Sequence, residues 1–179
     1  MPRQSRLVPL LLAALTLALF ASACGYESHE KDVVEGEPVE LGELSYNVIF
    51  SRFLNPSDNE DSAYLVGQPP VPAGSAYFGV FFEVQNESEE PQKLADSLTI
   101  EDAGHEKFEA IPSESLYALP LGDEVESQEQ IPVLDSTPQQ GPIEGSLALF
   151  LLPASASQNR PLTLHIPGPE GPGEVTLDL

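Results

Sequence analysis

The sequence predicts an all-β fold, an antiparallel β-sandwich that occupies residues 43–179. About seven short segments in this range carry apolar residues at every second position or in brief runs, as strands do. The chain holds 18 prolines and 13 glycines, many of which fall between those segments and are typical of turns. No long helical periodicity appears after residue 23. Many short strands without helices are typical of a sandwich.

Three predicted strands dominate this pattern. The first spans residues 44–51 and buries Leu44, Tyr46, Val48 and Phe50 on one face. The second spans residues 76–86, with Phe78, Val80, Phe82 and Val84 on one face and Tyr77, Phe81, Glu83 and Gln85 on the other. The third spans residues 143–152 and is apolar on both faces. Because apolar residues occur on both faces of the second and third strands, we expect both to lie in the middle of a sheet.

Shorter strands and loops complete the predicted domain. Residues 54–74 form a loop, and residues 111–142 form a long acidic connection with at most one short strand near 131–134. The remaining strands pair around turns: 98–100 with 107–110, and 162–166 with 175–179.

The first 23 residues have the three parts of an export signal. Arg3 and Arg6 give a basic start, residues 7–20 form an apolar run of 14 residues broken only by Thr16 and Pro9, and residues 21–23 are small. A membrane-spanning helix needs roughly 20 apolar residues. We therefore expect residues 1–23 to be a cleaved signal peptide.

Ala21-Ser22-Ala23-Cys24 resembles the lipobox of bacterial lipoprotein precursors. The resemblance implies that the signal is cut between Ala23 and Cys24 and that Cys24 carries a diacylglyceryl lipid. The alternative is an ordinary signal cut after Ala23, which would leave a free thiol. Cys24 is the only cysteine, and an exposed thiol is a liability in an oxidising compartment, so we favour lipidation. This predicts a protein anchored in the cell membrane, facing the extracytoplasmic side, with no other cofactor.

Residues 24–42 read as an acidic, flexible tether because acidic residues crowd this segment and its apolar residues are only scattered. All 29 acidic residues and five of the seven basic residues follow the predicted signal, so the mature net charge is −24. Such charge excludes a nucleic-acid partner, because phosphates need Lys and Arg. Cationic partners or Ca²⁺ are compatible with it, and solubility is the simplest explanation.

Three segments resemble a family of telokin-like, immunoglobulin-fold extracellular domains of unknown function, which is common in lipoproteins of Gram-positive bacteria. Residues 74–91 match a pattern G-x-x-Y, hydrophobic strand, N-x-S-x-x-P. Residues 98–108 match a strand–turn–strand segment, and residues 138–153 match a segment with Gly and Pro around a hydrophobic strand. The resemblance implies an immunoglobulin-like sandwich over residues 43–179, and it implies no catalytic residues.

The sequence offers few residues for chemistry. His105-Glu106 lies in a predicted turn and lacks the spacing of a zinc site, while the alternation around His165 points its side chain outward. Asp58, Glu60 and Asp61 are the candidates for Ca²⁺, but the spacing of a calcium-binding loop is missing and a solvated charge run is the favoured interpretation.

No serine-nucleophile or phosphate-loop motif is present in the sequence. We therefore expect a non-enzymatic binding or interaction module with an unknown protein or envelope partner. The alternatives are an envelope accessory protein that assists a membrane complex and, less favoured, a hydrolase with an unrecognised site.

Overall fold

The computed structural model describes residues 32–178. The predicted signal peptide, its cleavage site at Ala23 and Cys24, and the lipid attachment at Cys24 lie outside the described residues. No helix within residues 32–178 is long and apolar enough to cross a bilayer.

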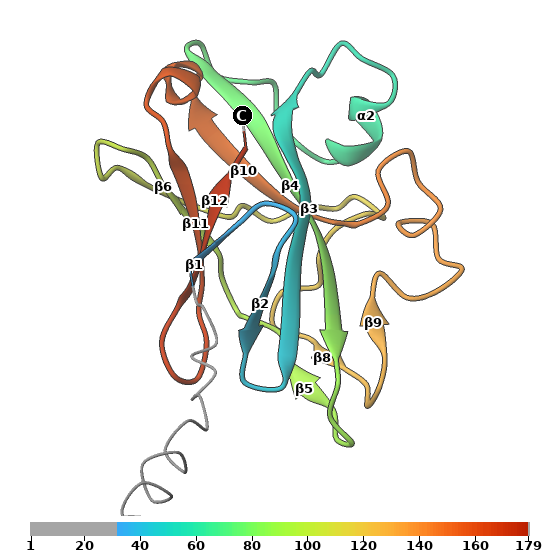
Figure 1. The fold of residues 1–179 in the computed structure, drawn as a ribbon. Coiled ribbons are helices and arrows are strands. Elements are labelled where there is room, and N and C mark those ends of the chain that lie inside the picture. The colour runs from blue at the N-terminus through green and yellow to red at the C-terminus, as the bar shows by residue number, and fades with distance from the viewer. Residues whose placement is uncertain (1–31, 179) are drawn as a thin grey trace, which may run out of the picture.

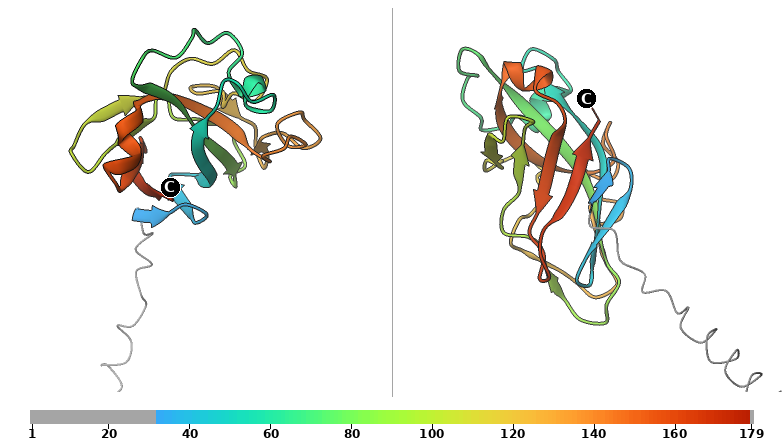
Figure 2. Two further views of the ribbon diagram at one scale, coloured as in Figure 1. Left: turned by 90° about the horizontal axis from the view of Figure 1, so that it is seen from above. Right: turned by 60° about the vertical axis from the view of Figure 1, so that its left-hand side comes forward.

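Two main sheets face each other across a shared core (Figures 1 and 2). The first contains, in spatial order, β1 (Asp32–Val34), β12 (Gly173–Leu177), β11 (Leu162–Ile166), β6 (Thr99–Glu101) and β7 (Lys107–Glu109). The second contains β10 (Ser146–Pro153), β4 (Ser75–Asn86), β3 (Leu44–Leu54) and β2 (Pro38–Leu41), and β9 (Gln130–Ile131) also pairs with β4. A small third sheet pairs β5 (Gln92–Lys93) with β8 (Glu124–Val125). All pairs are antiparallel except β1 with β12. The predicted β-sandwich is confirmed at this level.

The strand β4 is apolar on both faces because it packs on two sides. Phe78, Val80, Phe82 and Val84 are fully buried in the main core between the sheets. On the opposite face, Tyr77 and Phe81 pack in a second cluster with Leu54, Tyr64, Leu147 and Leu149. The predicted position in the middle of a sheet is correct for β4, which lies between β3 and β10. The same prediction is wrong for β10, which is the last strand of its sheet. On its far side, the described residues form only two isolated bridges, Ile111 with Leu149 and Ala118 with Leu147.

A β-bulge corrects the predicted alternation in β3. The register with β4 shifts between Val48 and Phe50, so Ile49 is the extra residue. One added residue reverses which side chains face the core. Phe50, expected in the core, is therefore 41% exposed, and Ser51, expected outside, is 3% exposed.

The predicted tether is too long, because residues 32–41 belong to the sandwich. β1 pairs with the last strand, β12, and β2 forms a hairpin with β3. Val39 and Leu41 are buried in the main core. The acidic composition concealed these strands, since only alternate side chains of β2 face inward.

The long connections fold back over the outer face of the second sheet. Within residues 54–74, a one-turn helix, α2 (Asp61–Tyr64), inserts Tyr64 between Phe81 and Tyr117, with ring centroids about 5 Å apart. The connection 111–142 contains two short strands, β8 and β9, where only one was predicted. A short 3-10 helix (Ala154–Gln158) follows β10.

Candidate functional site: an acidic face

The outer face of β3 and β4 changes character along its length. Near Tyr77 and Phe81 it is apolar and covered by α2 and the 111–143 chain. Farther along β4 it becomes polar, because Asn47 lies directly opposite Glu83 in the pairing of β3 with β4. Neighbouring side chains across antiparallel strands lie within contact distance, so these two polar groups form one surface.

A cavity of about 240 Å³ lies over this polar surface. We call it the Asn47 socket. Its lining combines two carboxylates, three amides and two aliphatic side chains: Glu83, Glu144, Asn47, Gln130, Gln139, Ile49 and Pro132. β3 and β4 lie at its base, and the chain between β9 and β10 closes the remaining side.

The Asn47 socket contains a hydrogen-bond acceptor without a donor. Within residues 32–178, no donor reaches Oδ1 of Asn47, although this atom is buried. A buried acceptor left unpaired costs about 1–3 kcal/mol. Two neighbouring amides are engaged elsewhere, since Gln130 Nε2 donates to the carbonyl of Pro132 at 3.4 Å and Gln85 Nε2 donates to Glu83 Oε1 at 3.4 Å. The lining of the socket thus combines acceptor oxygens of Glu83 and Glu144 with the amide N–H donors of Asn47 and Gln139.

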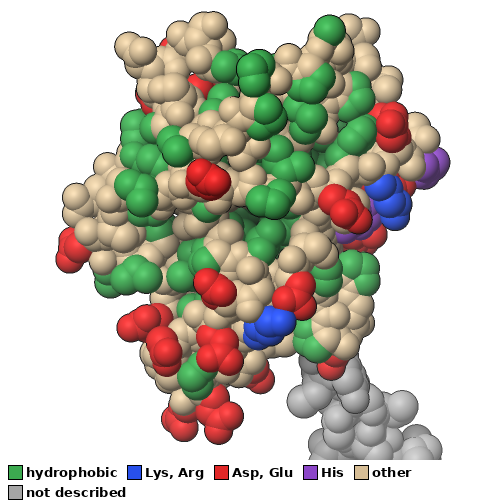
Figure 3. Space-filling model, turned by 180° about the vertical axis from the view of Figure 1, so that it is seen from behind, with side chains coloured by type: hydrophobic (Ala, Val, Ile, Leu, Met, Phe, Trp, Pro, Cys, Tyr) green, Lys and Arg blue, Asp and Glu red, His purple; other side chains and the backbone are tan. Residues whose placement is uncertain are grey.

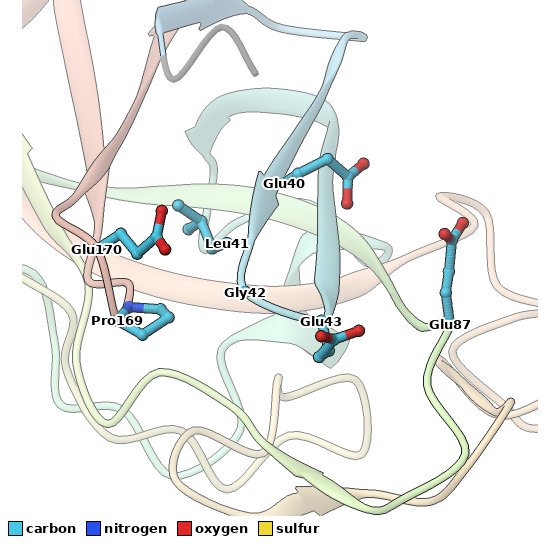
Figure 4. Close-up of a pocket in the computed structure, with 7 residues that line it drawn as sticks. All are labelled: Glu40, Leu41, Gly42, Glu43, Glu87, Pro169 and Glu170. Carbon is cyan, nitrogen blue, oxygen red and sulfur yellow. The ribbon is translucent and has the colours of Figure 1, made fainter. Parts of the chain in front are cut away.

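Two further cavities follow in a series, each sharing one residue with the cavity before it. A cavity of about 460 Å³ shares Gln130 with the socket and is also lined by Gln85, Asn86, Glu87, Gln128 and Glu129. A cavity of about 610 Å³ shares Glu87 with that one and reaches the β2–β3 hairpin and the β11–β12 turn. In Figure 4, Glu40 and Glu87 lie to one side of Leu41 and Gly42, and Glu170 approaches from the other.

We call the lining of these three cavities the acidic face. Seven of its residues are glutamates: Glu40, Glu43, Glu83, Glu87, Glu129, Glu144 and Glu170. No Lys, Arg or His of the described chain lines any of the three. Figure 3 shows acidic side chains crowded at the end of the molecule that carries β5 and β8. Such a surface attracts cations and repels anions.

The basic side chains within residues 32–178 lie elsewhere, and three of the four form ion pairs. Arg52 pairs with Glu60 and Asp61, Lys93 with Asp96, and Lys107 with Glu101. The fourth, Arg160, donates from Nε to the carbonyl of Ser157. None of these four cations lines the acidic face.

Two of the three predicted calcium candidates, Glu60 and Asp61, pair with Arg52. Both carboxylate oxygens of Asp61 face Arg52, and one also accepts from the N–H of Asn55 at 2.7 Å. Asp58 Oδ1 accepts from the N–H of Glu60 at 2.8 Å. Asp61 is 1% exposed, so the interpretation of a solvated charge run is wrong for this residue. No group of three or more His, Cys, Asp or Glu in the described part of the chain has an arrangement that could hold a metal ion.

A second polar cluster covers the outside of the first sheet. Glu101 contacts His105 Nδ1 at 2.6 Å, Lys107 Nζ at 3.2 Å and His165 Nε2 at 3.4 Å. Hydrogen bonds from His105 and Lys107 lower the pKa of Glu101. His105 is exposed in a turn, as predicted, while His165 points outward but is partly covered by Glu101 and Glu174. These contacts join β6, β7, β11 and β12.

Sequence reasoning missed the acidic face. Its glutamates come from positions as far apart as 40 and 170, and acidic residues are common throughout the chain. The polar outward positions of β3 and β4, Asn47 and Glu83, could have marked one end of it. Nothing in the sequence placed Glu87 and Glu129 around one cavity, because that arrangement depends on how β9 docks on β4.

The fold resembles those of two solved bacterial proteins. One is an uncharacterized β-sandwich protein from Clostridium difficile 630, with 13% identity, coverage of 86% of this chain and 98% of that chain, and a TM-score of 0.53. The other is the yjhA protein from Bacillus subtilis, with 13% identity, coverage of 81% and 99%, and a TM-score of 0.54. Similarity at this level shows a shared β-sandwich fold. No family model and no curated protein matches the chain.

Proposed function

We propose that this protein is a membrane-anchored extracytoplasmic binding module, without enzymatic activity, whose acidic face binds a basic segment of an envelope partner. The observation that carries the proposal is the set of three adjoining cavities lined by seven glutamates and no basic residue. A basic segment would neutralise this field, and electrostatic complementarity of this kind gives specificity and fast association.

The lipobox-like segment supports the anchoring part of the proposal. If Cys24 carries the lipid, only residues 25–31 separate it from β1. Eight Cα-to-Cα steps span at most about 29 Å. The maximum distance between the lipid anchor and the sandwich would therefore be shorter than with a tether that reached residue 42. This would keep the sandwich within reach of a membrane-bound partner.

We further infer that the sandwich is of the immunoglobulin-like, telokin-like kind. The motif residues of that family have structural roles here that support the inference. Asn86 and Ser88, from the N-x-S pattern, hydrogen-bond to each other and fix the turn that follows β4. In addition, β1 pairs in parallel with the last strand, β12, and forms one edge of the first sheet.

The anchor is tested by Cys24→Ala in the native host. Loss of membrane association, with accumulation of the unprocessed precursor, is the expected outcome. Normal processing and membrane association of the variant would contradict lipidation.

The binding proposal is tested with the full-length lipidated protein in nanodiscs of zwitterionic lipid. The probe is a nonapeptide of alternating arginine and glycine, titrated by calorimetry at low and high salt. We expect the affinity to fall at least tenfold between low and high salt. At low salt, we expect the triple variant Glu40→Gln/Glu87→Gln/Glu129→Gln to bind the peptide at least tenfold more weakly than the wild type.

The matched control, Glu106→Gln/Glu109→Gln/Glu114→Gln, removes the same charge from exposed positions outside the acidic face. Absence of binding, or an equal loss in this control, would overturn the proposal.

A further inference from the structure

We propose that a cavity beside the acidic face receives one large apolar side chain, of leucine or phenylalanine size, from the basic segment that the acidic face binds. The cavity is lined by Gln128, Glu129, Gln130, Val133 and Leu134, and we call it the Leu134 notch. This inference rests on the proposed function and deepens it, because it describes the partner segment as one that carries an apolar residue among its basic residues.

Exposed apolar side chains gather around the Leu134 notch. Val133 and Leu134 follow each other in the chain, and they are 51% and 64% exposed. Ile49, at 37%, lines the Asn47 socket, which shares Gln130 with the notch. Three of the seven exposed large apolar side chains of the described chain therefore line two cavities that share a residue. A single exposed leucine is ordinary in proteins, whereas exposed apolar side chains that are grouped beside polar ones are typical of an interaction site.

Both walls of the notch are held in place by backbone contacts. On one side, the carbonyl of Glu129 accepts from the N–H of Asn86, at the end of β4, at 2.9 Å. On the other side, the carbonyl of Val133 accepts from the N–H of Ser136 at 3.1 Å, which closes a turn. The cavity, of about 150 Å³, is therefore already formed in the chain without a partner. A volume of about 150 Å³ holds a benzene-sized group, so the notch fits one leucine or phenylalanine side chain and not a folded segment.

The charge beside the notch indicates which kind of chain supplies that side chain. Glu129 lines both the notch and the neighbouring cavity of the acidic face. Its carboxylate is exposed and forms no ion pair within residues 32–178. A second copy of this strongly acidic chain, or an anionic lipid headgroup, would bring like charge to this surface and be repelled. A segment with Arg or Lys next to the apolar residue complements both the carboxylate and the notch.

The test compares two peptides that differ only at one position. Each is the nonapeptide of alternating arginine and glycine, with its fourth residue replaced by leucine or by serine. Binding to the full-length lipidated protein in nanodiscs of zwitterionic lipid is measured by calorimetry at low salt, with the signal from empty nanodiscs subtracted. We expect the leucine peptide to bind at least fivefold more tightly than the serine peptide, because burial of an apolar side chain is favourable. Equal affinities would overturn the proposal.

Matched variants test whether the leucine of the peptide lies in the notch. Leu134→Ser shortens one wall of the notch, so it should abolish the advantage of the leucine peptide and leave the affinity for the serine peptide unchanged within twofold. The control Leu116→Ser removes an apolar side chain that is 79% exposed and lines neither the acidic face nor the notch, and the advantage should remain. Because both side chains are largely exposed, neither substitution should shift the unfolding midpoint. An advantage that survives Leu134→Ser, or that Leu116→Ser abolishes equally, would overturn the proposal.

The serine peptide distinguishes failure of the notch from failure of the proposed function. If the serine peptide binds and leucine adds nothing, the notch is overturned and the acidic face remains the binding surface. If neither peptide binds, both proposals fail. An advantage of leucine that depends on Leu134, together with binding of the serine peptide, supports both.

A third peptide tests whether the apolar side chain must come from a basic segment. It is the leucine peptide with glutamine in place of every arginine. We expect it to bind at least tenfold more weakly than the arginine form, because its neutral side chains do not complement the glutamates. Binding as tight as that of the arginine form would overturn the inference that a basic segment supplies the apolar side chain.

Discussion

The carboxylate of Glu35 accepts hydrogen bonds from both the N–H and the hydroxyl of Ser51, at 3.0 and 2.6 Å. It also accepts from the N–H of Asp178, next to the last strand. One side chain thus joins the first turn of the domain to β3 and to the end of β12. Ser51 faces inward only because of the β-bulge beside it, and Glu35 satisfies the polar groups that the bulge buries.

Glu35→Ala should destabilise the domain. The variant leaves the N–H and hydroxyl of Ser51 without their acceptor, which costs about 1–3 kcal/mol in the free energy of unfolding. Urea denaturation of the full-length protein measures the change. Asp32→Ala, which removes an exposed carboxylate from β1, is the matched control and should change the free energy by less than about 0.5 kcal/mol. Similar effects of the two substitutions would contradict this role of Glu35.

The ion pair between Arg52 and Asp61 should matter far more than that between Lys93 and Asp96. Asp61 is buried, so Arg52→Met would leave its charge uncompensated, and we expect a loss of about 2–3 kcal/mol. Lys93 and Asp96 are both exposed, so Lys93→Met should cost less than about 1 kcal/mol. Chemical denaturation measures the free energy of unfolding of both variants. Equal losses of free energy would contradict the greater importance of the buried ion pair between Arg52 and Asp61.

Asn86 holds the turn after β4 through five hydrogen bonds. Its Nδ2 donates to the carbonyls of Glu90, Val125 and Glu126 at 2.8–3.0 Å, and its Oδ1 accepts from the N–H and hydroxyl of Ser88. Asn86→Asp has the same shape but turns a carboxylate toward three carbonyl oxygens. We expect a loss of more than about 2 kcal/mol. The same substitution at exposed Asn59 is the control. A thermal melt in which both variants match the wild type would exclude this role.

The pH dependence of stability should report on Glu101. Hydrogen bonds from His105 and Lys107 hold its folded-state pKa below the ordinary value of 4.5. A carboxyl with a lowered folded pKa contributes stability that is fully present above its unfolded pKa and is lost as the pH falls through its folded pKa. Glu101→Gln should therefore lower the unfolding midpoint at pH 7, and the difference from wild type should shrink toward pH 3. Glu109→Gln, on the exposed side of neighbouring β7, should show no such trend. A difference for Glu101→Gln that stays constant with pH would contradict the prediction.

The strands that the sequence predicts best are those whose local pattern is unambiguous. The alternation of Phe78, Val80, Phe82 and Val84 places β4 correctly, and the turn at 102–104 places the hairpin of β6 and β7. The sequence fails where a single contact overrides the pattern. The bulge at Ile49 reverses β3, and the pairing of β1 with β12 draws an acidic segment into the sandwich.

The candidate site shows the same division. The chain is visibly acidic, and the polar outward positions on β3 and β4 can be read from alternation alone. Which carboxylates gather, and which amide is left without a partner, depends on the docking of β9 and of the chain up to β10. Those contacts join residues far apart in the sequence.

By itself, the sequence of this protein determined that residues 76–86 form a strand buried on both faces, that the fold is all-β, and that the charge is strongly negative. Local alternation and composition decide these properties, because each depends on neighbouring residues or on a sum over the chain. Only the tertiary structure decided that Glu35 supports Ser51, that Asp61 is buried against Arg52, and that Asn47 faces a cavity between Glu83 and Glu144. These are contacts across strands and loops, and strand register and chain path set them.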